Sequence, residues 1–124
     1  MRRISSGSPF EAAMGYSRAV VKGPWCWVSG TTGYDYARMV MPDDAADQAQ
    51  AAFTTIDAAL REAGFVMGDV VRVRYVVTDA ALVEEITPVL GTWLGEVRPA
   101  ATMIVADLIR PEMKVEIDVT AWRA

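Results

Sequence analysis

The most constraining feature of this sequence is the strict alternation of apolar and polar residues in KVEIDVTAW, residues 114–122. Successive side chains of a strand point to opposite faces of a sheet, so this pattern predicts a strand over 114–121 with one buried face. The apolar side consists of Val115, Ile117, Val119 and Ala121, and the other side of Lys114, Glu116, Asp118, Thr120 and Trp122.

Other parts of the chain also have the composition of strands. The β-branched run VVRVRYVVT, 70–78, predicts a strand with Val71, Val73, Tyr75 and Val77 on one face and Arg72 and Arg74 on the other. Further strands are expected at 17–22 and 25–29, on either side of a turn at Gly23 and Pro24, and at 102–108.

Two segments instead follow a helical period. From Pro42 to Gly64, apolar residues recur every three or four positions, with Asp43 or Asp44 as the N-cap. A second helix is expected at about 80–94, ended by Gly95 and interrupted by Pro88. The apolar stripes are Ala49, Phe53, Ile56, Leu60 and Ala63 in the first helix, and Leu82, Ile86, Val89 or Leu90, and Trp93 in the second.

This order of elements predicts one α+β domain over residues 1–124, with two helices on one face of a mixed sheet. Two helices cover only one face, so the face with Arg72, Arg74, Glu116 and Asp118 stays open in a monomer. Since 52% of the residues are hydrophobic, we expect an oligomer to cover that face, rather than solvent.

The composition excludes several kinds of chemistry. The chain has no histidine and one cysteine, which rules out a Ser-His-Asp triad, a Cys-His pair and histidine-based zinc sites. No loop has the spacing of a calcium site, so we expect neither a metal nor a cofactor. Cys26, between two tryptophans, is expected to be a buried and unreactive thiol.

Charge and hydropathy limit the partners. A net charge of -4 and the lack of a basic run argue against nucleic acid. No stretch approaches the roughly 18 apolar residues of a membrane helix, and no apolar block follows the first arginines as in a signal peptide. The sequence therefore predicts a soluble cytoplasmic protein with no membrane partner.

Five segments, in this order and spacing, resemble those of the Rid/YjgF family, also called L-PSP endoribonucleases, whose best-known members are imine/enamine deaminases. They are GYSRAV (15–20), WVSGTTG (27–33), AGFVMGDVVRVRYVVTD (63–79), RPAAT (98–102) and KVEIDVTA (114–121). The resemblance implies a chorismate-mutase-like fold, with a mixed six-stranded sheet and two helices on one face. It also implies a homotrimer that binds a small-molecule ligand in clefts between subunits.

The resemblance also assigns residues to these clefts. The family's tyrosine matches Tyr16, its serine-glycine pair matches Ser29 and Gly30, and its glutamate matches Glu116. In members with deaminase activity, the glutamate is thought to position the water that hydrolyses the imine. The alternative is that Glu116 has only a structural role, as a strand carboxylate paired with Lys114, Arg72 or Arg74. Asp118 is expected to form a structural charge network with the two arginines.

One position departs from the family pattern. Ala101 replaces the arginine that binds the substrate carboxylate, which places the chain in a subgroup without that arginine. Arg98 or Arg110 is an alternative source of the charge. A polar residue of the second helix falls at Thr87, and Trp93, near the end of that helix, is a candidate wall of the cleft. We expect a ligand that is less acidic and more apolar than a 2-imino acid.

Two functions remain open. The first is a Rid-like hydrolase or deaminase of a small imine, enamine or related reactive metabolite. The alternative is a trimer that binds a small metabolite for transport or regulation without chemistry. RNA cleavage, suggested by the family name, is disfavoured by the absence of histidine and the acidic balance.

Overall fold

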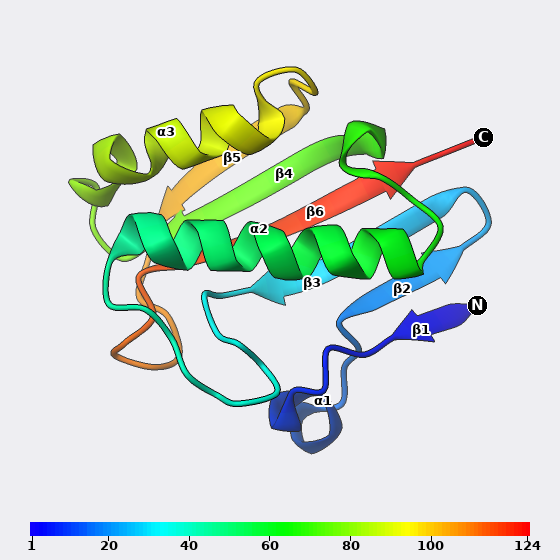
Figure 1. The fold of residues 1–124 in the computed structure, drawn as a ribbon, viewed down its shortest axis with the longest axis horizontal. Helices are drawn as coiled ribbons and strands as arrows, with labels where there is room; N and C mark the ends of the chain where they lie inside the picture. Colours follow the sequence, from blue (N-terminus) through cyan, green and yellow to red (C-terminus); the bar gives the residue numbers. More distant parts are fainter.

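Six strands form one mixed sheet in the computed structural model, which describes residues 1–124 (Figure 1). They lie in the order β1-β2-β3-β6-β4-β5, in which β4 and β5 are parallel and all other neighbours antiparallel. The strands are β1 (Arg2–Ile4), β2 (Ala19–Lys22), β3 (Trp25–Thr31), β4 (Val70–Val77), β5 (Ala100–Val105) and β6 (Val115–Trp122). The mixed sheet and the α+β class are confirmed.

The last strand, β6, lies inside the sheet between β3 and β4. Its apolar side is buried as the alternation predicts: Val115, Ile117 and Ala121 are 0% exposed. In β4, the prediction for Val71 is wrong, because the pairing with β6 shifts between Val70 and Arg72. The irregularity buries Val70 and leaves Val71 44% exposed, as expected where an extra residue changes the side to which a side chain points.

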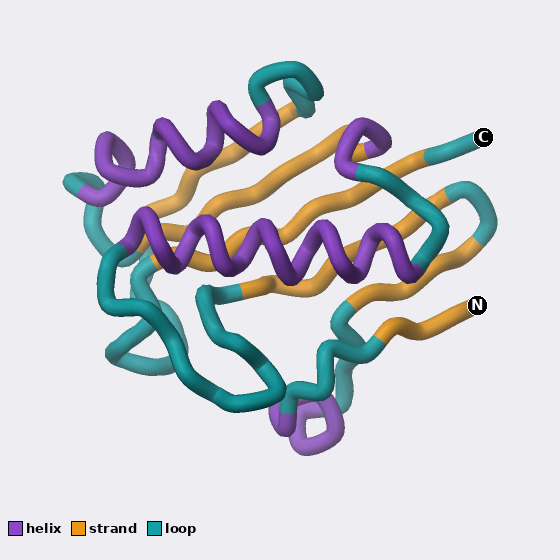
Figure 2. The backbone as a smooth tube through the Cα atoms, viewed as in Figure 1, coloured by secondary structure: helices purple, strands orange, loops and turns teal.

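Two long helices, α2 (Ala45–Glu62) and α3 (Leu82–Leu94), cover one face of the sheet (Figure 2). The predicted stripe of α2 is buried in the core, and Gly64 just after the helix has φ 87°, which glycine adopts without strain. In α3, Ile86 is fully buried and Pro88 lies inside the helix. None of the helices combines the length and apolar composition required to cross a membrane.

The structure adds short elements that the apolar periodicity did not reveal. These are β1, the 3-10 helix η1 (Met67–Asp69) and helix α1 (Pro9–Met14), which lies apart from α2 and α3 (Figure 1). Helix α1 begins where the Ser8 hydroxyl accepts a hydrogen bond from the Phe10 amide, and it ends at Gly15 with φ 74°.

The face of the sheet opposite α2 and α3 has no helical cover. At the β2–β3 turn end it carries Trp25, Trp27 and Trp122, which are 39%, 43% and 43% exposed, and the rings of Trp25 and Trp27 stack 6.0 Å apart. Cys26, between these tryptophans, points to the core, and burial raises its pKa to about 11. The expectation of a buried, unreactive thiol is thus supported.

Candidate active site

A cleft of about 290 Å³ opens at the other end of this uncovered face. It brings together three residues assigned from the sequence, Tyr16, Gly30 and Glu116. The remaining walls are Phe10, Met14, Thr32, Tyr36, Arg74, Ile109 and Met113. Residues from both halves of the chain therefore meet here.

Glu116 is the acidic group of the cleft. It lies on β6 between Val115 and Ile117, both fully buried on the helix side, so its carboxylate points to the open side. Burial raises the pKa of Glu116, and the nearby Asp118 raises it further, while Arg74 and Arg18 act in the opposite direction. A carboxyl group with a raised pKa is suited to exchange protons with water or a ligand.

The Glu116 carboxylate forms no hydrogen bond or ion pair within the chain. The pairings with Lys114, Arg72 or Arg74 that a purely structural role would require are therefore absent. Lys114 Nζ donates to the carbonyl of Asp43, Arg72 Nη2 to Thr102 Oγ1, and Arg74 Nε to Asp118 Oδ2. The Arg74–Asp118 ion pair, at 2.9 Å, forms one part of the charge network expected from the sequence, whereas Arg72 bonds to Thr102 and not to Asp118. Glu116 remains free to bind a ligand or water.

The absence of a side chain at Gly30 leaves room for the Glu116 carboxylate. A Cβ at position 30 would lie 2.7 Å from Glu116 Cδ and 2.9 Å from Oε1. The pairing of β3 with β6 is irregular between Val28 and Thr31, and this irregularity brings the backbone close to the acid. Glycine is therefore required here for close approach.

Arg18 fixes the wall behind Gly30. Its side chain is fully buried, and Nη1 donates to the carbonyl of Gly30 at 2.8 Å and to Thr31 Oγ1 at 3.1 Å. The guanidinium carbon lies 4.3 Å from the centre of the Tyr36 ring and 5.6 Å from that of Tyr16. Two aromatic walls of the cleft thus rest on one buried cation.

Tyr16 and Ser29 have different places. The amide of Tyr16 donates to the carbonyl of Glu11 in α1, so this helix sets the position of the ring. Ser29 does not line the cleft, because its hydroxyl donates to the carbonyl of Ser17 at 2.6 Å. Within one chain, Ser29 links β3 to the segment that carries Tyr16.

The other predicted residues lie away from the cleft of the same chain. Thr87 is exposed on α3 and donates to the carbonyl of Val83. Trp93 stacks on Phe53 of α2 at 5.5 Å, in the helical layer. Ala101 pairs with Val73 of the helix-covered side, the side opposite Glu116.

Sequence reasoning missed Tyr36 and Thr32, where the Thr32 amide donates to the Tyr36 hydroxyl at 2.8 Å. The sequence signal was the pair of tyrosines, Tyr34 and Tyr36, that follows Gly33 in a loop, but only the fold shows which way they point. It also missed Arg74 as a cleft residue, the one cation among the lining residues. Arg110, one alternative to the missing arginine, lies over Phe10 at 4.7 Å, next to the cleft.

No group of three or more potential ligands from histidine, cysteine, aspartate and glutamate is positioned to hold a metal ion. The cleft instead combines one partner-free carboxylate, one cation and three aromatic rings. Such a set can hold a small, partly apolar molecule and place a carboxylate beside its polar atom.

Comparison with known proteins agrees with the fold along the whole chain. Residues 6–123 match the family described as Endoribonuclease L-PSP. The chain is 31% identical to the Streptomyces coelicolor protein SCO2049 over 99% of its length and 92% of that protein.

Solved structures agree as well. The chain matches Rv2704 of Mycobacterium tuberculosis, described as a member of the YjgF/YER057c/UK114 family, with a TM-score of 0.90 and 41% identity over 98% of each chain. It also matches RidA of an Antarctic Psychrobacter with a TM-score of 0.89 and 27% identity over 99% of this chain and 100% of that one.

Proposed function

The chain belongs to the Endoribonuclease L-PSP family, which includes the YjgF and RidA proteins, and from this membership we propose that it is a Rid-like hydrolase. Its substrate would be a small imine, enamine or related reactive metabolite. The observation that carries this proposal is the Glu116 carboxylate, which has no partner in its own chain and lies beside the Gly30 backbone in a cleft with aromatic walls.

The proposed reaction is hydrolysis of a carbon-nitrogen double bond. Glu116 accepts a proton from water as the water oxygen bonds to the imine carbon, and it then returns a proton to the nitrogen. Glu116 then carries the proton of the new hydroxyl group to the same nitrogen as the carbon-nitrogen bond breaks, so an imine and one water give a carbonyl compound and ammonia. A raised pKa of Glu116 supports these proton transfers, because it brings the proton affinity of the carboxylate closer to that of the oxygen and nitrogen atoms with which it exchanges protons.

The remaining walls suggest which ligands fit. Tyr16 and Tyr36 offer ring faces to an apolar body, and Arg74 offers a cation that is already shared with Asp118. With Ala101 in place of the family's arginine, a bidentate contact worth roughly 1.5–3 kcal/mol per charged hydrogen bond is missing. We therefore favour an imine that is less acidic than a 2-imino acid.

The assembly proposed is a homotrimer with each cleft between two subunits. Supporting this, the uncovered face carries large exposed apolar side chains that a monomer leaves in water. Within one chain, Ala101, Thr87 and Trp93 lie on the side opposite Glu116. A neighbouring subunit would therefore have to supply these residues to a shared site.

The test is ammonia release from imines generated by an amino-acid oxidase and from uncharged imines. Glu116→Gln should abolish turnover without changing the oligomeric state, whereas the matched control Glu85→Gln, on the exposed surface of α3, should keep it. Turnover that survives in Glu116→Gln would contradict the role of this carboxylate.

The same assay tests the substrate class. Ala101→Arg should raise kcat/KM for acidic imines by about tenfold or more, since 1.4 kcal/mol corresponds to tenfold, and leave uncharged imines nearly unaffected. Equal use of acidic imines by both proteins would refute the account of Ala101.

Ala101 also favours the second candidate, a trimer that binds a metabolite without converting it. Ligand binding in a thermal-shift assay, with no ammonia from any imine, would support that function. Cleavage of RNA that disappears in Glu116→Gln would favour an endoribonuclease over both.

A further inference from the structure

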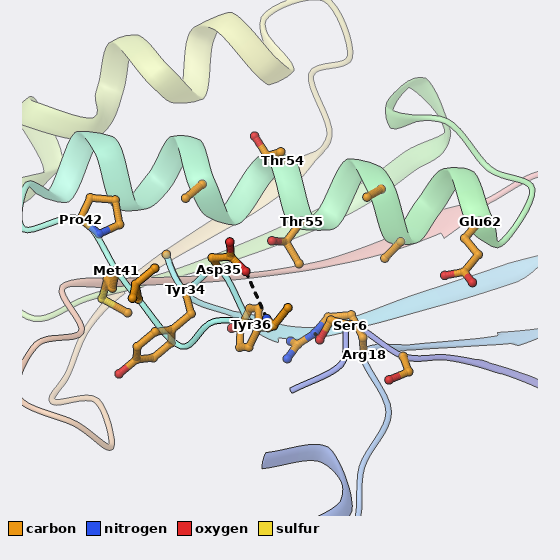
Figure 3. Close-up of a pocket in the computed structure, with 17 residues that line it drawn as sticks. Ser6, Arg18, Tyr34, Asp35, Tyr36, Met41, Pro42, Thr54, Thr55 and Glu62 are labelled. Carbon is orange, nitrogen blue, oxygen red and sulfur yellow. Dashed lines mark hydrogen bonds between the residues drawn. The ribbon is translucent and has the colours of Figure 1, made fainter. Parts of the chain in front are cut away.

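A second and larger hollow lies on the other side of Tyr36, between helix α2 and the loop 33–42 (Figure 3). We refer to this hollow, about 820 Å³ in volume, as the α2 groove. Its volume lies within the range of about 300–1,000 Å³ found for small-molecule sites. Tyr36 contributes to both hollows, but Glu116 lines only the cleft.

The α2 groove has an unusual polar group at one end. Arg18 lines the groove and is 0% exposed, yet no carboxylate lies within ion-pair distance of its guanidinium. Its hydrogen bonds all go to neutral groups, namely Ser6 Oγ, the Gly30 carbonyl and Thr31 Oγ1. The acidic groups near it act only indirectly: Ser6 Oγ, which accepts from Arg18 Nε, donates to Glu11 Oε2 at 2.6 Å, and the charge of Arg18 also acts on Glu116. A buried cation without a direct ion pair is costly, because burial removes the water that stabilises it.

One nitrogen of this guanidinium is left over. Arg18 Nη2 is the only buried side-chain nitrogen or oxygen atom of the chain with no hydrogen-bond partner. Buried polar atoms are almost always paired in native structures, so an orphaned donor calls for a partner. In Figure 3 the guanidinium of Arg18 lies between Tyr36 and Ser6, with its nitrogens directed toward Tyr36.

The rest of the α2 groove is suited to an apolar body. Ala51, Ala58 and Ala59 of α2 form one wall, and Val40, Met41 and Pro42 belong to the opposite loop. The carboxylate of Asp35 also borders the groove, but its Oδ1 accepts hydrogen bonds from the amides of Ala37 and Arg38 within the same loop. Glu62 adds a second carboxylate to the lining, so Arg18 is the one cation of the groove, and its Nη2 is the one buried polar atom there without a partner.

We propose that the α2 groove is a second ligand site, separate from the Glu116 cleft, for a small organic carboxylate with an apolar body. The carboxylate lies at the Arg18 end, where it forms the direct ion pair that Arg18 lacks and accepts a hydrogen bond from Nη2 after a small adjustment of the surrounding side chains. The hydroxyl of Ser6, which accepts a hydrogen bond from Arg18 Nε, belongs to the same end. The hydrocarbon part lies along the alanines of α2.

The probe is hexanoate, compared with hexanamide, which has the same shape without the charge. Calorimetric titration and thermal shift of the full chain should show hexanoate binding at least about tenfold more tightly, since hydrogen bonds between charged groups are worth roughly twice neutral ones. Equal affinity for the acid and the amide, or no binding of hexanoate, would overturn the proposal.

Variants locate the binding. Ala58→Phe fills the α2 groove from an exposed helix position. It should lower the affinity for hexanoate at least about tenfold, because a loss of 1.4 kcal/mol in contacts corresponds to tenfold. Ala46→Phe places the same ring on α2 outside the groove and should leave affinity within about twofold. Arg18→Gln should abolish the preference for the acid over the amide; since this variant risks misfolding, Ala58→Phe is the independent check.

Glu116→Gln separates the two sites. Hexanoate binding should be unchanged in that variant, and any ammonia release should be unchanged in Ala58→Phe. If Glu116→Gln abolishes hexanoate binding and Ala58→Phe does not, the carboxylate binds in the cleft and the proposal is wrong. If Ala58→Phe instead dissociates the oligomer and hexanoate does not bind, the α2 groove is covered by a second copy of the chain, which also refutes it.

Discussion

The two faces of β6 show how one strand carries two different tasks. On the helix side, Val115, Ile117, Val119 and Ala121 are at most 2% exposed and form the centre of the core. On the other side, Glu116, Asp118 and Thr120 are only half-buried and Trp122 is exposed. Neighbouring residues thus lie in different surroundings: one set forms the core, and the other faces away from the helices and stays partly exposed.

The open side is itself divided along its length. One end carries the three exposed tryptophans, and the other holds the Glu116 cleft. Large apolar side chains exposed together favour association, whereas a charged group without a partner favours a ligand. Exposure alone therefore does not define the site, since only the cleft end combines exposure with a raised carboxyl pKa and close backbone approach.

The largest effect is expected on the covered face. Ile117→Ala should lower the free energy of unfolding by about 2–5 kcal/mol, because it leaves a cavity beneath the helices. Thr120→Ala, on the open side of the same strand, is the control and should change it by less than about 1 kcal/mol. Urea denaturation measures both, and similar losses for the two variants would remove the distinction between the faces.

The tryptophan end should matter for assembly. Trp27→Glu should weaken subunit association by about 2–4 kcal/mol, as for a central interface aromatic, while the fold persists. Analytical ultracentrifugation should then detect smaller species, with far-ultraviolet circular dichroism unchanged. Val66→Glu, an apolar residue of similar exposure outside the sheet, should leave the assembly intact; dissociation by both variants would argue against a specific interface at the tryptophans.

Close approach at the cleft end should be sensitive to a single methyl group. Gly30→Ala should cost about 1–3 kcal/mol in stability, since the new Cβ must displace the Glu116 carboxylate. Any turnover should fall with it. Gly91→Ala provides the control, because nothing lies within 4 Å of its added Cβ, and it should be neutral or slightly stabilising. Thermal unfolding that is equal in the two variants would contradict the packing of Gly30 against Glu116.

The smallest effect concerns the charge of Glu116. Its pKa is raised in the folded protein, so the protonated form of Glu116 favours folding. This stabilisation is fully present below pH 4.5, the pKa of the group in the unfolded chain, and is lost as the pH rises through the pKa of the folded state. Glu116→Gln should therefore raise the Tm by a few degrees at neutral pH and lose this advantage at acidic pH. Melting curves from pH 3 to 8 test the sign, and a Tm lowered at neutral pH would show that the carboxylate is stabilised by partners.

The periodicity of the sequence predicted most of the fold because long elements repeat their pattern many times. The alternation in 114–122 and the stripe of α2 each align several side chains with one core. Short elements lack such repetition: β1 has three residues and α1 has six. Helix α1 still left a local signal, Ser8 and Pro9 at its start and Gly15 at its end, which capping chemistry explains.

Only part of the candidate site could be predicted from the sequence. Residue types and the resemblance pointed to Tyr16, Gly30 and Glu116, and the structure places all three on one cleft. The same reasoning named Thr87, Trp93 and Ala101, which lie on the other side of the sheet in the same chain. The direction of Ala101 depends on strand register, and that of Thr87 and Trp93 on how α3 packs on the sheet. A resemblance in sequence gives neither.

Local patterns in the chain were sufficient to predict the class of fold, the buried face of β6 and the kinds of catalysis that the absence of histidine excludes. Tertiary structure alone decided that Val71 points outward, that Tyr36 reaches the cleft and that Arg18 is buried with an unpaired nitrogen. The physical reason is that burial, pairing and pKa depend on contacts between residues far apart in the chain. Local periodicity fixes which side of an element is apolar, but only packing decides which groups meet.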